Sequence, residues 1–213
     1  MILRDMFPHL SGADGDVEVT GLTADSRQVK PGYVFAAMQG VVTDGRKYIP
    51  GAIEAGAVAV MGEGLPAMSG ATAVNVENAR LALAQASARF YPQQPATMVA
   101  VTGTNGKSST VDFLRQIWQS AGLKSASMGT LGAIGPSGHI DLGHTTPDPV
   151  AIHATLQALA TDGVSHVAME ASSHGLAQYR LDAVERQMAQ MQTSMSQMQT
   201  SISTLETSMG LVL

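Results

Sequence analysis

The chain has 213 residues, of which 45% are hydrophobic and 14% charged, with a net charge of −5 and no cysteine. The charged fraction lies below the roughly 25% of typical soluble domains, so a highly charged disordered chain is excluded. The acidic balance argues against a nucleic-acid-binding protein, and the lack of cysteine excludes disulfides, thiolate metal sites and a cysteine nucleophile. No run of apolar residues is close to the length of a membrane helix, which needs about 18. The N-terminus also lacks the basic segment followed by an apolar stretch that marks a secretory signal. We therefore expect a cytoplasmic protein without a membrane span or secretory signal.

Residues 1–93 have the alternating pattern of a small α/β domain. The expected elements, in chain order, are a buried strand at 33–38, a short helix at 50–56, apolar runs at 57–61 and 72–76, and a helix at 78–90. Asn78 is the predicted N-cap of that last helix, because its side chain can accept hydrogen bonds from the first backbone N–H groups. The proline-containing stretch 91–95 interrupts the pattern, and we place the domain boundary there.

Residues 96–182 predict a second α/β unit. The expected elements are a strand at 98–102, a helix with Val111, Leu114, Trp118 and Ala121 on one face, a strand at 124–128, an irregular glycine-rich stretch at 129–143, a helix starting at Thr146-Pro147 and running to 161, and a strand at 164–169. Alternating strands and helices predict a mostly parallel sheet, in which ligands bind at the carboxyl ends of the strands. The loops at Gly103, Thr145 and Glu170 should therefore lie at one edge.

Residues 183–213 have a different composition, with apolar side chains spaced by four and three. The series is Val184, Met188, Met191, Met195, Met198, Ile202, Leu205, Met209 and Val212. This heptad pattern favours a coiled-coil-like helix that makes the chain a homo-oligomer through residues 184–212. The alternative is a single amphipathic helix that packs on its own domain.

The stretch 101–109 predicts a phosphate-binding turn between a strand and a helix. Glycines at 103 and 106 let the backbone present N–H groups to phosphate oxygens, and a helix N-terminus adds partial positive charge. Lys107 can reach the terminal phosphates, and the Ser108 hydroxyl can bind Mg²⁺. Val101 stands where the usual first glycine would be, so this is a shorter variant. The alternative is a glycine turn that only caps the helix, with Lys107 in solvent.

Glu170 is the candidate metal-binding carboxylate, because it ends a strand of the same predicted sheet. A carboxylate there can bind Mg²⁺ directly or through water. The alternative is an ordinary strand-end glutamate in solvent, but the small polar residues at 171–175 favour a ligand site. His174 is ambiguous: it can orient Glu170, contact substrate or hydrogen-bond within its loop.

Five segments in this order, 22–27, 44–49, 102–108, 145–147 and 169–176, are similar to motifs of the Mur ligases of peptidoglycan synthesis. The resemblance covers residues 1 to about 182 and is specific because the motifs occur in the family's order. It implies a UDP-sugar-binding N-terminal domain at 1–93 and a partial ATP-binding central domain at 96–182. The heptad helix at 183–213, predicted from its periodicity, follows as a third segment. The expected fold class is α/β, with an incomplete P-loop-type, mostly parallel sheet flanked by helices.

The resemblance also implies a reaction and a set of site residues. ATP with Mg²⁺ phosphorylates the carboxylate of a UDP-N-acetylmuramoyl dipeptide, and a diamino acid, diaminopimelate or lysine, attacks the acyl phosphate to become the third peptide residue. Lys107 and Glu170 would be catalytic, with Ser108 and Glu170 at the metal. The ATP-binding residues would be Gly103, Thr104, Asn105, Gly106, Lys107, Ser108 and Ser109. The substrate-binding residues would be Ser26, Thr145, Thr146, Ser172, Gln178 and Arg180.

The sequence departs from the family after Asp182. The family continues with a second metal-site histidine, a carbamylated lysine and a third domain that selects the amino acid, whereas this sequence continues with the heptads. We therefore expect a truncated ligase that is weakly active or inactive, with an exposed sheet edge or apolar face. The alternative is a non-catalytic nucleotide- or UDP-sugar-binding module that oligomerises through its heptads. A small kinase would leave the Thr145 and Ser172 motifs unexplained.

Overall fold

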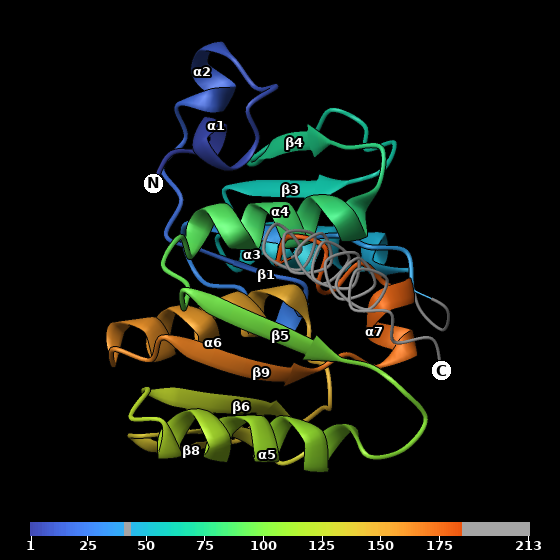
Figure 1. The fold of residues 1–213 in the computed structure, drawn as a ribbon. Coiled ribbons are helices and arrows are strands. Elements are labelled where there is room, and N and C mark those ends of the chain that lie inside the picture. The colour runs from blue at the N-terminus through green and yellow to red at the C-terminus, as the bar shows by residue number, and fades with distance from the viewer. Residues whose placement is uncertain (41–43, 185–213) are drawn as a thin grey trace, which may run out of the picture.

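A computed structural model of the chain describes residues 1–40 and 44–184, which form two sheets with their flanking helices (Figure 1). The predicted heptad helix and the oligomer that it would mediate lie outside the described residues, apart from Val184. Within the described residues, no helix is long and apolar enough to cross a membrane. The α/β fold class is confirmed for the described part of the chain.

The first sheet contains four parallel strands in the order β1-β2-β3-β4. Its strands are β1 (Gly21–Thr23), β2 (Tyr33–Ala36), β3 (Ala59–Gly62) and β4 (Thr72–Asn75). The helical elements in this half are α1 (Leu3–Met6), α2 (Gly12–Gly15), η1 (Ser26–Gln28), η2 (Gly45–Tyr48), α3 (Ile49–Glu54) and α4 (Ala79–Phe90). Asn78 caps α4 as predicted, with its side-chain oxygen accepting from the N–H groups of Arg80 and Leu81 at 3.1 Å. Alternation along the strands divides their side chains between two apolar clusters, one including Leu83 of α4 and the other Ala52 of α3.

The second sheet contains five strands in the order β5-β9-β6-β7-β8. Its strands are β5 (Thr97–Val101), β6 (Ser125–Gly129), β7 (Gly132–Gly135), β8 (Gly138–Ile140) and β9 (His166–Glu170). Its helices are α5 (Lys107–Ser120), α6 (Pro149–Thr161) and α7 (Ser173–Ala177). β5, β9 and β6 are parallel, whereas β7 and β8 are antiparallel additions, so the sheet is mostly parallel where the site was expected.

Helices α5 and α6 lie on opposite faces of this sheet (Figure 1). Ala126 and Met128 of β6 join the apolar cluster that contains Leu156 of α6. The side chain of Ser125, which directly precedes Ala126, instead donates to the carbonyl of Arg115 in α5. Successive strand residues point to opposite faces, so this alternation assigns one face to each helix. α6 also packs against α4 and thereby connects the two halves of the molecule.

The helix start predicted at Thr146-Pro147 is wrong by two residues. α6 begins at Pro149, and Asp148 is its N-cap: one carboxylate oxygen accepts from the N–H groups of Val150 at 2.9 Å and Ala151 at 3.1 Å. Thr146-Pro147 and Asp148-Pro149 follow each other directly in the sequence. Each is a capping residue followed by proline, so both satisfy the local rule for a helix start. The hydroxyl of Thr146 has a tertiary role instead.

The stretch predicted to be irregular at 129–143 contains a β-hairpin. β7 and β8 pair antiparallel, with Gly135 opposite Gly138 across a two-residue turn. Strands of three and four residues that are rich in glycine lack the β-branched and alternating pattern from which strands are recognised. The hairpin forms because β7 adds to β6, which is itself held in the sheet by β9.

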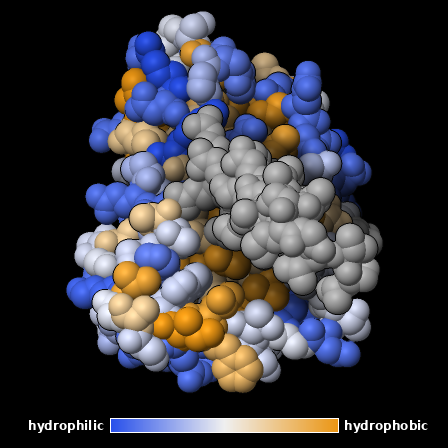
Figure 2. All heavy atoms as spheres, in the orientation of Figure 1, coloured by the Kyte–Doolittle hydropathy of each residue, from blue (hydrophilic) through white to orange (hydrophobic). Residues whose placement is uncertain are grey.

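The second half exposes an apolar surface, in agreement with the expected open edge. Phe113 and Ile117 of α5 and Leu131 are each 62% exposed. Figure 2 shows hydrophobic surface gathered on this half of the molecule. β5 is an outer strand of the sheet among residues 1–40 and 44–184.

Candidate functional site

The turn after β5 leads directly into α5 and exposes the first N–H groups of that helix. Gly103 has φ 149° and Gly106 has φ 80°, a region of backbone conformation that favours glycine. Gly106 is the N-cap and provides no side-chain oxygen to the helix. A Cβ placed on Gly106 would meet no atom within 4 Å, so the turn faces open space. The helix start is thus uncapped and accessible, as an anion-binding turn requires.

Lys107 is half-buried and folds back over the turn. Its Nζ donates to the carbonyl oxygen of Gly103 at 2.7 Å. The ammonium group therefore lies at the opening between the two glycines rather than extending away from the protein. The charge of Lys107, the N-terminus of α5 and the N–H groups of the turn therefore lie on one side, where together they can bind a phosphate.

Glu170 lies beside the turn, because it is the register partner of Val101 on the neighbouring strand. It is only 3% exposed, in contrast to the alternative of a solvated glutamate. Oε1 accepts from the backbone N–H of Thr130 at 2.9 Å, and Oε2 accepts from the Thr130 hydroxyl at 3.3 Å. Gly129 makes room for the carboxylate, since a Cβ there would lie 2.1 Å from Oε1.

A small cavity between α5 and the sheet lies between Ser108 of α5 and the Glu170 carboxylate. Ser108, Asp112, Gly129 and Glu170 are among its lining residues. Asp112 is already paired with Arg115, so Glu170 and the Ser108 hydroxyl are the remaining candidates for a metal. The described residues contain no group of three or more His, Asp or Glu side chains that could hold a metal by themselves. Mg²⁺ typically takes one or two carboxylates and completes its coordination with phosphates and water, so these two oxygens fit a nucleotide-bound Mg²⁺.

Thr146 ties the carboxyl end of β9 to the following loop. Its hydroxyl donates to the Glu170 carbonyl at 3.1 Å and accepts from the Ser172 N–H at 3.0 Å. The Ser172 side chain in turn caps α7 by accepting from the Gly175 N–H at 3.0 Å. The hydroxyls of Thr146 and Ser172 are therefore engaged within the protein.

Arg180 and Gln178 lie next to Thr146 and bond to each other. The guanidinium donates to Gln178 Oε1 at 2.8 and 3.2 Å and to the carbonyl of Thr146. Burial lowers the pKa of Arg180, and the Asp148 carboxylate acts in the opposite direction. His174 Nε2 lies 2.7 Å from Gln178 Nε2, a contact within its own segment, which was one of the three roles considered for it.

Thr145 contacts Thr130, which lies on the turn between β6 and β7. Its hydroxyl lies 2.9 Å from that of Thr130, which in turn contacts Glu170. The structure thus brings the predicted residues 103–109, Thr145, Thr146, Glu170 and Ser172 to one edge of the second sheet.

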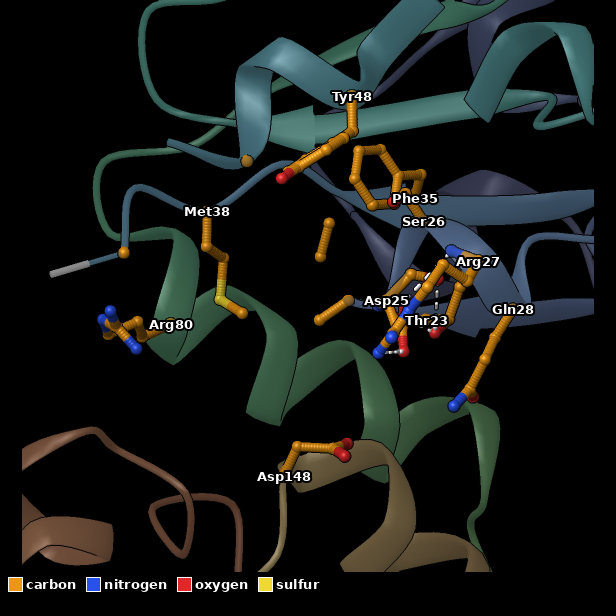
Figure 3. A pocket seen from close by; sticks show the side chains of 14 residues that line it. Thr23, Asp25, Ser26, Arg27, Gln28, Phe35, Met38, Tyr48, Arg80 and Asp148 are labelled. Carbon is orange, nitrogen blue, oxygen red and sulfur yellow. Dashed lines mark hydrogen bonds and ion pairs between the residues drawn. The ribbon is translucent and has the colours of Figure 1, made fainter. Parts of the chain in front are cut away.

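Ser26 is separate from this cluster and lines a pocket of about 620 Å³ in the first half. Figure 3 shows Arg27 folded onto Asp25, with Asp148 approaching from the start of α6. The hydrogen bonds from Arg27 lower the pKa of Asp25, which therefore remains ionised. The pocket combines cations, carboxylates, hydroxyls and the aromatic ring of Phe35, a mixture suited to a polar ligand with an apolar or planar part.

Several residues of these sites were not predicted from the sequence. They include Gly129 and Thr130 next to Glu170, and Arg80 and Asp148 in the pocket of Ser26. Gly129 and Thr130 directly follow an apolar strand, and this was the available signal. Asp148 reaches this pocket through the packing of α6 against α4, whereas Arg80 lies at the start of α4, and no local pattern reveals either placement.

Comparisons with known proteins match both halves of the chain. Residues 18–91 match the Mur ligase family catalytic domain, and residues 101–197 match the Mur ligase middle domain. The UDP-N-acetylmuramoyl-L-alanyl-D-glutamate–2,6-diaminopimelate ligase of Mesorhizobium japonicum is 48% identical over 190 residues, covering 87% of this chain and 39% of its own length. The enzyme of the same name from Rhizobium meliloti is 51% identical, covering 84% of this chain and 38% of its own length.

The fold agrees with solved structures of the same family. A UDP-N-acetylmuramoyl-L-alanyl-D-glutamate–2,6-diaminopimelate ligase superposes with a TM-score of 0.75 at 26% identity, covering 86% of this chain and 38% of the other. MurF from Acinetobacter baumannii, at 22% identity and a TM-score of 0.51, shares the fold. The chain spans somewhat less than two fifths of the length of these relatives. With matches to the family over both halves and the corresponding fold, the chain belongs to the Mur ligase family.

Proposed function

We propose that this chain provides the ATP-binding and UDP-precursor-binding parts of an amide ligase of peptidoglycan precursor synthesis. The amide would join a diamino acid to the D-glutamate of UDP-N-acetylmuramoyl-L-alanyl-D-glutamate. The names of the two relatives described above support diaminopimelate as that amino acid. If ATP and a UDP-linked precursor are the substrates, the reaction would take place in the cytoplasm.

The observation that supports this proposal best is the placement of Lys107 and Glu170 at one sheet edge. β5 and β9 are adjacent and parallel, so the phosphate turn and the carboxylate emerge side by side. ATP with Mg²⁺, when bound, supplies the phosphoryl group that activates a substrate carboxylate. The turn N–H groups and Lys107 would hold the phosphates, and Ser108 and Glu170 would hold the metal. Such catalysis consists mainly of positioning and of neutralising charge.

The two ligand sites divide between the two halves of the molecule. The pocket of Ser26 would take the UDP-sugar, with Arg80 as a cation for its diphosphate and Arg27 held beside it by the ion pair with Asp25. Thr145, Thr146, Ser172, Gln178 and Arg180 would contact the muramoyl peptide between that pocket and the phosphate turn. Several of their polar groups already bond within the protein, so they would also act by holding the loops in place.

Separate calorimetric titrations test this proposal on the 213-residue chain. One uses a non-hydrolysable ATP analogue with Mg²⁺, and the other uses UDP-N-acetylmuramoyl-L-alanyl-D-glutamate. We expect both ligands to bind, Lys107→Met to weaken only the ATP analogue, and Ser26→Trp to weaken only the UDP ligand. If neither ligand binds to the folded chain, the proposed function is wrong.

A further inference from the structure

We propose that Thr130 is a positioning residue that fixes the Glu170 carboxylate for a nucleotide-bound metal and connects it to Thr145. The inference rests on the proposed function, because it assumes a metal at Glu170. Thr130 follows β6 and precedes β7, so it lies across the strand ends from the phosphate turn. It is exposed, yet its backbone and side chain each contact Glu170.

The carboxylate of Glu170 is buried without a cation. The ion pairs found among residues 1–40 and 44–184 join other side chains, and the hydrogen bonds to the Glu170 carboxylate there come from Thr130 alone. Burying an ionised carboxylate is costly unless it is paired or coordinates a metal. Two hydrogen bonds from one residue satisfy only part of its acceptor capacity, which is about four lone pairs. The remaining lone pairs are free for a cation in the cavity that Ser108 also lines.

The directions of the hydrogen bonds follow from the chemistry of the groups. The Thr130 hydroxyl donates its single hydrogen to Glu170 Oε2. The 2.9 Å contact between the two threonine hydroxyls must then use the hydrogen of Thr145. The Thr145 hydroxyl therefore donates to the Thr130 hydroxyl, which in turn donates to the Glu170 carboxylate. The lone pairs of Thr145 are left to accept from another group, such as an amide N–H of the substrate.

The local backbone adds a steric limit to this arrangement. A Cβ on Gly129 would lie 2.1 Å from Oε1, 2.5 Å from Cδ and 2.6 Å from Cγ of Glu170. The carboxylate thus packs directly on the backbone of the residue before Thr130, and Thr130 holds both of its oxygens. Residues that orient a metal ligand in this way typically change metal affinity by about 10- to 100-fold when altered.

Paired substitutions separate the hydroxyl from the shape of the side chain. Thr130→Val keeps the branched shape and the backbone N–H but removes the hydroxyl, whereas Thr130→Ser keeps the hydroxyl. The readout is binding of Mn²⁺, as a substitute for Mg²⁺, measured by electron paramagnetic resonance in the presence of a non-hydrolysable ATP analogue. Calorimetry of the analogue without metal, together with the melting temperature, reports any general loss of structure.

We expect Thr130→Val to weaken Mn²⁺ about 10-fold while the metal-free affinity for the analogue stays within about 2-fold, and Thr130→Ser to stay close to the unmodified chain. Equal Mn²⁺ affinity in Thr130→Val and the unmodified chain would overturn the role of Thr130 and leave the proposed function intact. An equal loss in Thr130→Ser and Thr130→Val would overturn it as well. Failure of the unmodified chain to bind Mn²⁺ with the analogue would contradict the proposed function and this inference together.

Discussion

Val101 and Glu170 face each other as register partners at the carboxyl ends of β5 and β9. Through this one pairing, a glycine turn with a lysine and a buried carboxylate come from segments almost seventy residues apart and meet at one edge. Parallel neighbouring strands impose this meeting, because their carboxyl ends point the same way. The site therefore depends on the order of strands as much as on the identities of its residues.

Removing the charge of Lys107 should weaken nucleotide binding. Lys107→Met should lower affinity for a non-hydrolysable ATP analogue by about 10- to 100-fold, since hydrogen bonds to charged groups contribute about 1.5–3 kcal/mol. Titration calorimetry measures this change. Lys124→Met is the matched control, because Lys124 donates to the Asp162 carbonyl at the opposite end of the strands. An equal loss in both variants would argue against a specific role for Lys107.

Adding a methyl group at Gly129 should displace Glu170. Gly129→Ala would place a Cβ 2.1 Å from Oε1, and such overpacking costs about 1–3 kcal/mol. Urea denaturation should show this loss, and the Mn²⁺ affinity should fall with it. Gly51→Ala is the control, because it lies in α3 with no atom within 4 Å of the new Cβ, and it should be neutral or stabilising. Unchanged stability of Gly129→Ala would mean that the carboxylate can move without cost.

Substitutions of Asp148 test whether its side chain caps α6. Asp148→Ala should destabilise the chain by about 1 kcal/mol, because the N–H groups of Val150 and Ala151 lose their acceptor. Asp148→Asn should retain most of the stability, since an asparagine oxygen accepts the same bonds. Thermal and urea unfolding measure both variants. If Asp148→Ala has no effect on stability, a different residue caps the helix.

The stability of the fold should decrease at acid pH because of His153. This side chain is fully buried in α6, and desolvation lowers its pKa from 6.5 to about 4. The unfolded chain binds this proton below pH 6.5 while the folded chain resists it, so stability is retained above pH 6.5 and lost as pH falls toward 4. The full loss is about 3 kcal/mol.

Urea unfolding at pH 7.5, 6 and 4.5 measures this contribution. His153→Gln should reduce the difference in unfolding free energy between pH 7.5 and 4.5, whereas the exposed His139→Gln should leave it unchanged. The Gln94 side chain, whose Nε2 lies 3.0 Å from Nδ1 of His153, remains in both variants. Identical pH profiles for the unmodified chain and His153→Gln would contradict this assignment.

Amide formation by the 213 residues alone should be weak or absent. The relatives that share both halves are more than twice as long, and this chain covers about 38% of them. Incubation with UDP-N-acetylmuramoyl-L-alanyl-D-glutamate, ATP, Mg²⁺ and diaminopimelate, followed by mass spectrometry, detects the product. Binding of both ligands without product would favour the binding-module alternative for this chain, and efficient product formation would contradict the expected truncation.

The local features of the fold were predictable from the sequence, because each depends on neighbouring residues. The strands at Val99 and Val167, the glycine turn and the Asn78 cap follow from apolar runs and capping chemistry. The β7–β8 hairpin was missed because its stability comes from β6 rather than from its own glycine-rich sequence. The start of α6 was misplaced because two adjacent pairs obey the same capping rule, and only tertiary contacts of Thr146 separate them.

The candidate site was predictable in its residue types but incompletely in its contacts. Lys107 stands out because it follows the glycine turn after one strand, and Glu170 because it ends a neighbouring strand of the same sheet. The contact of Thr130 with Glu170 depends on the β6–β9 register, and that of Asp148 with the pocket of Ser26 depends on how α6 packs against α4. Contacts between residues so far apart in the chain produce no periodic pattern in the sequence from which they could be predicted. The predicted heptad association at 184–212 stays a prediction.

A crystal structure of the chain with a non-hydrolysable ATP analogue and Mg²⁺ examines the phosphate turn itself. We expect the β- and γ-phosphates against the N–H groups at the start of α5, with Lys107 Nζ moved from the Gly103 carbonyl onto a phosphate oxygen and the metal near Ser108 and Glu170. Analogue bound elsewhere, with Lys107 still on Gly103, would show that this turn does not bind nucleotide.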